Sequence, residues 1–167
     1  MDMFTVIQKL SAGLPWTIAL TVVSFVVGAS LAIPVCMLRS SRNTAISYFG
    51  ATLILIVRSV PPIVWLFAVF FAIGQHVIRL SPFAAAVIGL SLITAANLAE
   101  IYRGALKAVP KGQTEASKVM GLSVWQRYRY VLAPQVMHIT LPTASSYAIE
   151  LLKNTAIASA IGVADMA

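Results

Sequence analysis

Charged residues are scarce in this sequence of 167 residues. Asp, Glu, Lys and Arg together make up 10% of the chain, whereas hydrophobic residues make up 59%. A soluble domain is about one quarter charged, because charged side chains are needed to cover its surface. The composition therefore excludes an ordinary soluble domain and predicts a membrane protein.

Cysteine and histidine are nearly absent as well. Cys36 is the only cysteine, so it can form no disulfide within the chain, and its place in an apolar run predicts a small core residue. His76 and His138 lie far apart with no ligand spacing around them, which argues against a metal site. The sequence has no G-x-x-x-x-G-K-[ST] phosphate loop, no H-E-x-x-H and no G-x-S-x-G. We therefore expect no metal, no cofactor and no catalytic site in this chain.

The few charges are mostly basic and give a net charge of +7. In a soluble protein this balance would suggest a nucleic-acid partner, but no basic face interleaved with aromatic residues is present. The lysines and arginines lie mainly in loops between apolar runs, where they set the orientation of a membrane protein. We expect membrane lipid around the chain and no nucleic-acid partner.

Four apolar stretches approach the roughly 20 residues that a helix needs to cross a bilayer. The predicted spans cover about residues 14–38, 59–78, 82–102 and 138–162. A shallow helix is expected at 44–57, with Arg58 at the membrane edge, because an arginine at the centre of one longer span would cost roughly 3 kcal/mol or more. The predicted fold is an all-α integral membrane bundle that forms one domain over residues 1–167.

Prolines mark several of the expected helix ends. Pro15 is expected in the first turn of the first span, and Pro34 is expected to kink its far end. Pro61 and Pro62 suit the first turn of the second span, where missing N–H groups cost least. Ser81 is expected to cap the third span, ahead of the proline that follows it.

Lysine and arginine are unevenly distributed among the loops. Residues 103–129 hold six, whereas the N-terminal dozen residues hold only Lys9 and the segment between the second and third spans holds only Arg79. Cytoplasmic loops carry the excess of positive charge in membrane proteins. This rule places residues 39–58 and 103–137 in the cytoplasm and the N-terminus outside.

The larger cytoplasmic loop contains the polar sequence KGQTEASKVMGLSVWQRYRYVLAP. Two short helices with a tight corner are expected here. Thr114 can begin the first helix, and Gly121 suits the C′ position that ends it. Ser123 and Gln126 have the spacing of a capping box, so a second helix is expected to start there and to be broken by Pro134. On these grounds alone, an amphipathic connector lying on the lipid headgroups is an alternative.

The spacing of this loop resembles the EAA loop of ABC-importer permeases. That pattern reads E-A-A, three residues, G, nine residues, I-x-L-P, and this sequence has E-A-S, G and V-x-A-P at the same spacing from Glu115 onward. Ser117, Val131 and Ala133 replace Ala, Ile and Leu. The segments AEIYRGALKAVPKGQTEA, RSVPPIV and LKNTAIASAIGV are similar to segments of permeases for polar amino-acid uptake. The resemblance covers about residues 10 to 165.

The resemblance implies a multi-span helical bundle of the type I importer permease kind. Such a subunit sits in the bacterial inner (plasma) membrane and translocates polar amino acids by ATP-driven alternating access. The implied partners are a second permease subunit, identical or different, two cytoplasmic ATPase subunits that hold ATP and Mg, and an external amino-acid-binding protein. A fifth span usually follows the fourth, so we expect a sequence that ends at Ala167 to be a fragment or unusually short. The resemblance assigns to the coupling helix Glu115, Ala116, Ser117 and Gly121.

Polar residues at membrane depth are candidates for a substrate path or a gate. They are Asn97, Glu100, Glu150 and Lys153. Glu100 and Arg103 are three apart on a helix and can instead form a structural ion pair, and the same holds for Glu150 and Lys153. Asn97 can instead make a hydrogen bond between helices.

Two other classes of function, an enzyme and a scaffold, are alternatives for a helical membrane protein with one polar loop. A membrane-embedded enzyme would need a catalytic constellation at membrane depth, and no span carries paired carboxylates. A non-transporting membrane scaffold that recruits a soluble partner through its loop is the remaining alternative. An importer subunit differs from such a scaffold because it brings down an ATPase whose turnover rises with an external binding protein.

Overall fold

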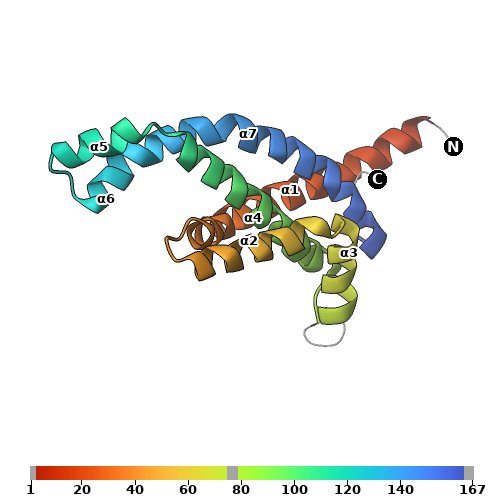
Figure 1. Ribbon diagram of the computed structural model, residues 1–167. Coiled ribbons are helices and arrows are strands. Elements are labelled where there is room, and N and C mark those ends of the chain that lie inside the picture. The colour runs from red at the N-terminus through yellow and green to blue at the C-terminus, as the bar shows by residue number, and fades with distance from the viewer. Residues whose placement is uncertain (1–2, 75–78, 164–167) are drawn as a thin grey trace.

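The computed structural model describes residues 3–74 and 79–163, and every regular element in these ranges is a helix (Figure 1). The all-α expectation is therefore confirmed for them, while His76 and the end of the expected 59–78 span lie outside the described residues. The elements are α1 (Met3–Arg39), α2 (Thr44–Ser59), α3 (Pro62–Phe67), η1 (Ala68–Ile73), α4 (Pro82–Ala108), α5 (Lys111–Val119), α6 (Val124–Gln126), η2 (Arg127–Leu132), α7 (Ala133–Asn154) and η3 (Thr155–Ile161). η1 and η2 are π-helices, and η3 is a 3₁₀-helix.

α4 is the central element of the bundle. α1, α2, α3 and α7 all pack against it, and α1 does so most extensively. Most of its residues from Ala85 to Ala99 are buried, and many of them are small. Small side chains let helix backbones approach closely, which is how helices associate in a membrane.

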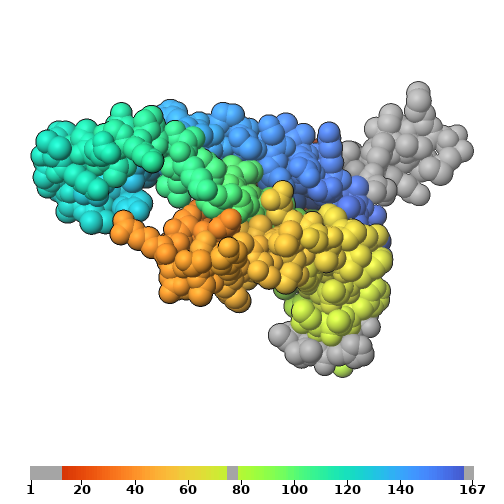
Figure 2. All heavy atoms as spheres, viewed as in Figure 1, coloured from red at the N-terminus to blue at the C-terminus, as the bar shows by residue number. Residues whose placement is uncertain are grey.

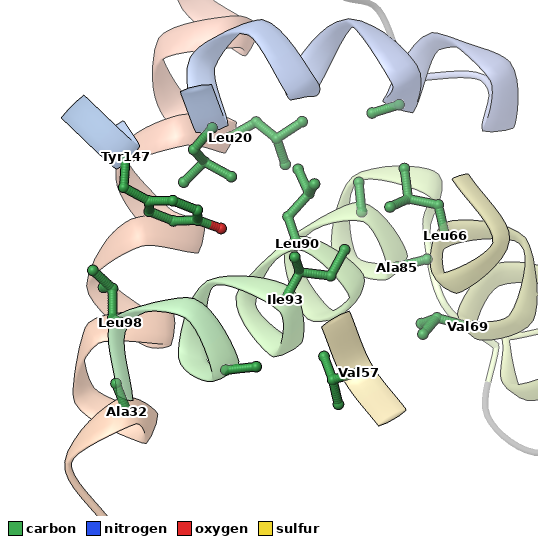
Figure 3. Close-up of a cluster of buried hydrophobic side chains, with 14 of the residues drawn as sticks. Leu20, Ala32, Val57, Leu66, Val69, Ala85, Leu90, Ile93, Leu98 and Tyr147 are labelled. Carbon is green, nitrogen blue, oxygen red and sulfur yellow. The ribbon is translucent and has the colours of Figure 1, made fainter. Parts of the chain in front are cut away.

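The buried core lies around α4 (Figure 3). Leu20 of α1, Leu90 of α4 and Tyr147 of α7 belong to one cluster, and Leu66 of α3 joins it from the other side. Cys36 belongs to the same cluster, so its predicted role as a small core residue is confirmed. These contacts hold together helices that are far apart in the sequence.

α1 and α4 come very close at Gly28. A Cβ atom at this position would lie 2.5 Å from the Cβ and Cγ2 atoms of Thr94 and 3.0 Å from the backbone oxygen of Ser91. Nearby, the Ser91 hydroxyl donates a hydrogen bond of 3.3 Å to the backbone carbonyl of Ser24 on α1. The contact between the two helices therefore requires that residue 28 has no side chain.

Within residues 3–74 and 79–163, two helices are long and apolar enough to cross a membrane, in agreement with the first and third predicted spans. They are Gly13–Arg39, within α1, and Pro82–Ala108, which is α4. α1 begins at Met3, so Pro15 lies inside the helix and not in its first turn as expected. The N-terminus of α4 matches the prediction, because the Ser81 hydroxyl accepts a hydrogen bond of 3.2 Å from the backbone N–H of Ala84.

The chain breaks between the helix expected at 44–57 and the span expected at 59–78, as predicted, but the helix that follows the break is short. α2 ends just before Pro61 and Pro62, and the chain bends by 97° into the helix that follows. α3 and η1 have six residues each, so together they reach about 18 Å, whereas the hydrocarbon layer is about 30 Å thick. The indole N–H of Trp65 stabilises the bend by donating a hydrogen bond of 3.0 Å to the Val57 carbonyl. The described residues therefore form a bent helix pair, α2 and then α3 with η1, and the second member of the pair is shorter than a full span.

The fourth predicted span, 138–162, falls on α7 and η3. α7 begins earlier, at Ala133, and changes into a 3₁₀-helix at Thr155. Its 22 residues are about 33 Å long, which is enough to cross a bilayer. Because α7 carries several polar and charged residues, it is not among the helices that qualify by composition, and its place across the membrane stays a prediction.

The close packing at Gly28 can be tested by adding one methyl group. Gly28→Ala is expected to destabilise the protein by about 1–3 kcal/mol, because the new Cβ overlaps Thr94. The matched control is Gly104→Ala in α4, where a Cβ meets no atom within 4 Å and alanine favours the helix by about 1 kcal/mol. Thermal unfolding of the purified protein in detergent measures both changes. Equal melting temperatures for the two variants would contradict the proposed packing.

Candidate functional site

α5, α6 and η2 form an arm at one end of the molecule, where α4 and α7 meet (Figure 1). α4 ends at Ala108 because Pro110 disfavours a helical conformation for the residue before it. α5 then begins at Lys111, with Pro110 in the N-cap position. The first helix of the arm therefore starts earlier than Thr114, where the sequence placed it.

Gly121 ends α5 in the conformation that the sequence predicted. Its φ is +72°, in the left-handed region that favours glycine. The N–H of Gly121 bonds to the Lys118 carbonyl at 3.0 Å, and the N–H of Leu122 bonds to the Ser117 carbonyl at 3.2 Å. This is the Schellman pattern, which satisfies two of the last carbonyls of the helix.

The other side of the corner is fixed by the predicted capping box. The Ser123 hydroxyl accepts a hydrogen bond of 3.3 Å from the backbone N–H of Gln126, and the Gln126 side chain accepts one of 2.9 Å from the backbone N–H of Ser123. The guanidinium group of Arg127 also donates a bond of 3.4 Å to the Leu122 carbonyl. The corner between α5 and α6 is thus held by hydrogen bonds on both sides.

Pro134 does not break the second helix, contrary to the expectation from the sequence. α6, η2 and α7 follow one another without interruption from Val124 to Asn154. In η2 the backbone bonds span five residues, as in the bond from the Ala133 N–H to the Tyr128 carbonyl. This wider turn accommodates the Pro134 ring, which in a regular α-helix would clash with the carbonyl four residues earlier.

Large apolar side chains are exposed at the tip of the arm, which protrudes from the molecule in Figure 2. Val119 is 89% exposed, Met120 is 76%, Val124 is 64% and Trp125 is 69%. We call these four residues the arm tip. A group of exposed apolar side chains marks an interaction surface. Sequence reasoning missed it, although the signal is visible as apolar pairs on both sides of the corner glycine.

The predicted coupling residues fall on two sides of α5. Glu115 and Ala116 are exposed, whereas Ser117 is buried against the rest of the arm. Its hydroxyl donates a hydrogen bond of 2.7 Å to the Thr114 carbonyl, so the serine that replaces alanine leaves no unpaired polar group. The structure thus brings Glu115 and Ala116 to the surface and places Ser117 beneath them.

A second polar group lies where α1, α2 and α4 meet. The predicted pair of Glu100 and Arg103 is present, with a hydrogen bond of 2.9 Å from Arg103 Nε to Glu100 Oε2. Arg39, which sequence reasoning did not select, lies with its Nε 3.6 Å from Glu100 Oε1. Its Nη1 also donates a hydrogen bond of 2.9 Å to the Ser47 hydroxyl of α2. We call Arg39, Glu100 and Arg103 the ion cluster, because together they join the end of α1 to α4.

Asn97 lies one turn before Glu100 and is half-buried. Its side-chain amide donates a hydrogen bond of 3.0 Å to the Ile93 carbonyl of its own helix, and Asn97 also interacts through a side-chain hydrogen bond with Tyr147 of α7, as the interhelical alternative predicted. The hydroxyl of Tyr147 also donates a hydrogen bond of 3.3 Å to the Thr94 hydroxyl, so this tyrosine joins α7 to α4. Tyr147 was not selected from the sequence, because its partner is 53 residues away.

Glu150 and Lys153 lie on α7 and are both exposed. Within the part of the chain that the structure describes, they form no ion pair with each other. Charges at bilayer depth usually face protein or water rather than lipid. These two residues are therefore available to a neighbouring subunit or to an aqueous path.

Comparisons with known proteins agree with the resemblance drawn from the sequence. Residues 24–167 match the family model described as "Binding-protein-dependent transport system inner membrane component". The chain is 34% identical over 157 residues to the L-cystine transport system permease protein TcyB of Bacillus subtilis, covering 94% of this chain and 67% of that protein. It is 35% identical over 173 residues to the glutamate/aspartate import permease protein GltJ of Escherichia coli, covering 93% and 69%.

Solved structures give the same result for the fold. One, described as an amino acid ABC transporter with histidines, is similar with a TM-score of 0.86 and 28% identity, covering 99% of this chain and 79% of that chain. An inward-facing structure of the MetNI methionine ABC transporter is similar with a TM-score of 0.83 and 25% identity, with the same coverage. The expected importer-permease fold is therefore confirmed.

The corner of the arm can be tested at Gly121. Gly121→Ala is expected to weaken the end of α5 by about 1 kcal/mol, because a side chain is disfavoured at positive φ. Amide hydrogen exchange in α5 should then become about fivefold faster. Gly112→Ala is the matched control, since it lies in the same helix without positive φ and with no atom within 4 Å of an added Cβ. The same acceleration in both variants would show that the conformation of Gly121 is not what holds the corner.

Proposed function

Because this chain belongs to the family of binding-protein-dependent transport system inner membrane components, we propose that it is an ABC-importer permease subunit that translocates polar amino acids. The relatives are permease proteins for L-cystine and for glutamate or aspartate, and one structural neighbour is an amino-acid transporter. Their shared substrate class supports amino acids as cargo. The matched relatives are permeases and not enzymes themselves.

The observation that carries this proposal is the arm with its exposed apolar tip. A transporter without its own phosphate loop must receive the energy of ATP hydrolysis through a contact surface. The arm tip is such a surface, and Glu115 and Ala116 lie exposed on the adjoining helix. We assign Glu115, Ala116, Ser117 and Gly121 to the coupling helix that meets an ATPase subunit.

The proposed assembly contains several other proteins. Two ATPase subunits bind ATP and Mg in the cytoplasm, a second permease subunit, identical or different, completes the pore, and an external binding protein delivers the amino acid. ATP-driven movement of the arms switches the cavity between outward and inward openings. The chain would lie in the bacterial inner membrane with its N-terminus outside, because the six basic residues of 103–129 favour the cytoplasm.

The proposed substrate path involves Asn97, Glu100, Glu150 and Lys153. Asn97 and Glu100 lie on the central helix, and Glu100 is already engaged by the ion cluster, which suits a gate better than a free binding site. Glu150 and Lys153 are exposed on α7. Their charges favour a position facing the water-filled path or the second permease subunit.

The coupling role can be tested with a charge reversal on α5. In a complex reconstituted with its ATPase and binding protein, Glu115→Lys should lower the stimulation of ATPase turnover by the binding protein at least tenfold, because an exposed contact group changes sign. Lys118→Gln, an exposed residue of the same helix, is the matched control and should change it less than twofold. The amount of protein inserted in membranes should be the same for both.

Other outcomes of this experiment separate the two candidate functions. A chain that brings down no ATPase would contradict the importer assignment. A chain that brings down a soluble partner without amino-acid uptake would instead favour a membrane scaffold.

The path can be tested on α7. Glu150→Gln and Lys153→Met, singly and together, are expected to reduce the rate of amino-acid uptake about fivefold, because each removes a charge from the proposed path. Ser145→Ala is the matched control, since this exposed hydroxyl donates a hydrogen bond to the Leu141 carbonyl of its own helix. Unchanged uptake kinetics in folded variants would remove Glu150 and Lys153 from the path.

A further inference from the structure

A polar pocket lies where the chain turns from α1 into α2. Its volume is about 340 Å³. Its lining includes two arginines, three aliphatic hydroxyl groups and one tyrosine, which are Arg39, Ser41, Arg42, Thr44, Ser47 and Tyr48. No carboxylate lines the pocket. In Figure 2 this segment is the orange surface below the arm.

The pocket carries positive charge that the described residues do not neutralise. Arg42 is exposed and forms no ion pair within the described part of the chain. Arg39 bonds to Ser47 and lies 3.6 Å from Glu100, but Arg103 binds the same carboxylate. Two guanidinium groups therefore share the Glu100 carboxylate, and Arg42 adds a third positive charge, which leaves a net positive charge at the pocket.

The pocket lies at the edge of the apolar part of the protein. The apolar helix Gly13–Arg39 ends at the pocket, and the end of a helix that crosses the bilayer lies where hydrocarbon gives way to lipid headgroups. Met37 and Phe49 flank the pocket in sequence and are 70% and 62% exposed, as suits side chains beside acyl chains. Tyr48 is 70% exposed, and tyrosine is enriched at the membrane–water interface. Basic pockets between helices at this level bind lipid headgroups.

We propose that this pocket binds a negatively charged phosphate group, supplied by the headgroup of an anionic phospholipid. Arg42 provides a free, planar guanidinium, whose paired N–H groups match two phosphate oxygens. The Ser41 hydroxyl accepts a hydrogen bond of 3.2 Å from the backbone N–H of Asn43, which leaves its own proton to donate. A headgroup held here joins the end of α1 to the start of α2.

The test measures lipid binding to the intact chain by native mass spectrometry in detergent. The probes are phosphatidylglycerol, phosphatidylcholine as the zwitterionic comparison, and inorganic phosphate as a soluble competitor. Arg42→Gln should weaken phosphatidylglycerol binding about fivefold, as expected for the loss of one cationic group near the surface. Arg42→Lys should weaken phosphatidylglycerol binding less, because lysine keeps the positive charge and lacks only the paired N–H groups of the guanidinium. Lys107→Gln, another exposed cation, is the matched control and should change binding less than twofold.

The outcomes are distinguishable from those of the transport experiments, because binding is measured without an ATPase. Phosphatidylglycerol that stays bound in about 10 mM inorganic phosphate supports the lipid as the source. Displacement by phosphate in the parent but not in Arg42→Gln would overturn the lipid as the source and would assign the pocket to a soluble phosphate. Equal losses for Arg42→Gln and Lys107→Gln, or equal binding of the two lipids, would overturn the proposal. Unchanged helicity and elution volume of Arg42→Gln show that a loss is not caused by unfolding.

Discussion

The contact of Gly28 with Thr94 sets the distance between α1 and α4, and the rest of the bundle is arranged around that pair. The missing side chain lets the two backbones approach, and the bond from Ser91 to the Ser24 carbonyl can then form between them. Close packing matters more here than in a soluble protein, since lipid offers little hydrophobic drive for helices to associate. With α1 and α4 fixed, α2, α3 and α7 have a common surface against which to pack.

Local signals predicted the local structure well. The capping box at Ser123, the left-handed Gly121 and the cap at Ser81 depend only on residues within about one turn, so their spacing in the sequence was sufficient. The pair of Glu100 and Arg103 was predictable for the same reason, because residues three apart share a helix face. The family pattern in the loop extended these local predictions to a function.

Features that depend on distant residues were not predictable from spacing. Arg39 joins Glu100 from another helix, and Tyr147 reaches Thr94 across 53 residues, so no local pattern marks either contact. Pro134 was expected to break its helix, but a π-helical turn absorbs it because α7 must continue into the bundle. The break after α2 was predicted from its two prolines, but its angle of 97° was not, because spacing along the chain does not fix the direction of the next helix.

α4 connects the two polar features of the molecule. It carries Glu100 of the ion cluster and continues without a break to Ala108, a distance of about 12 Å along the helix, where the arm begins. On the other side, the Gln135 side chain at the start of α7 donates a hydrogen bond of 3.3 Å to the Gln113 side chain of α5, which connects the arm to α7. A force applied at the arm tip therefore acts on α4 and α7 together. Because Arg39 holds Glu100 from α1, any rotation of α4 must either carry α1 with it or break that ion pair.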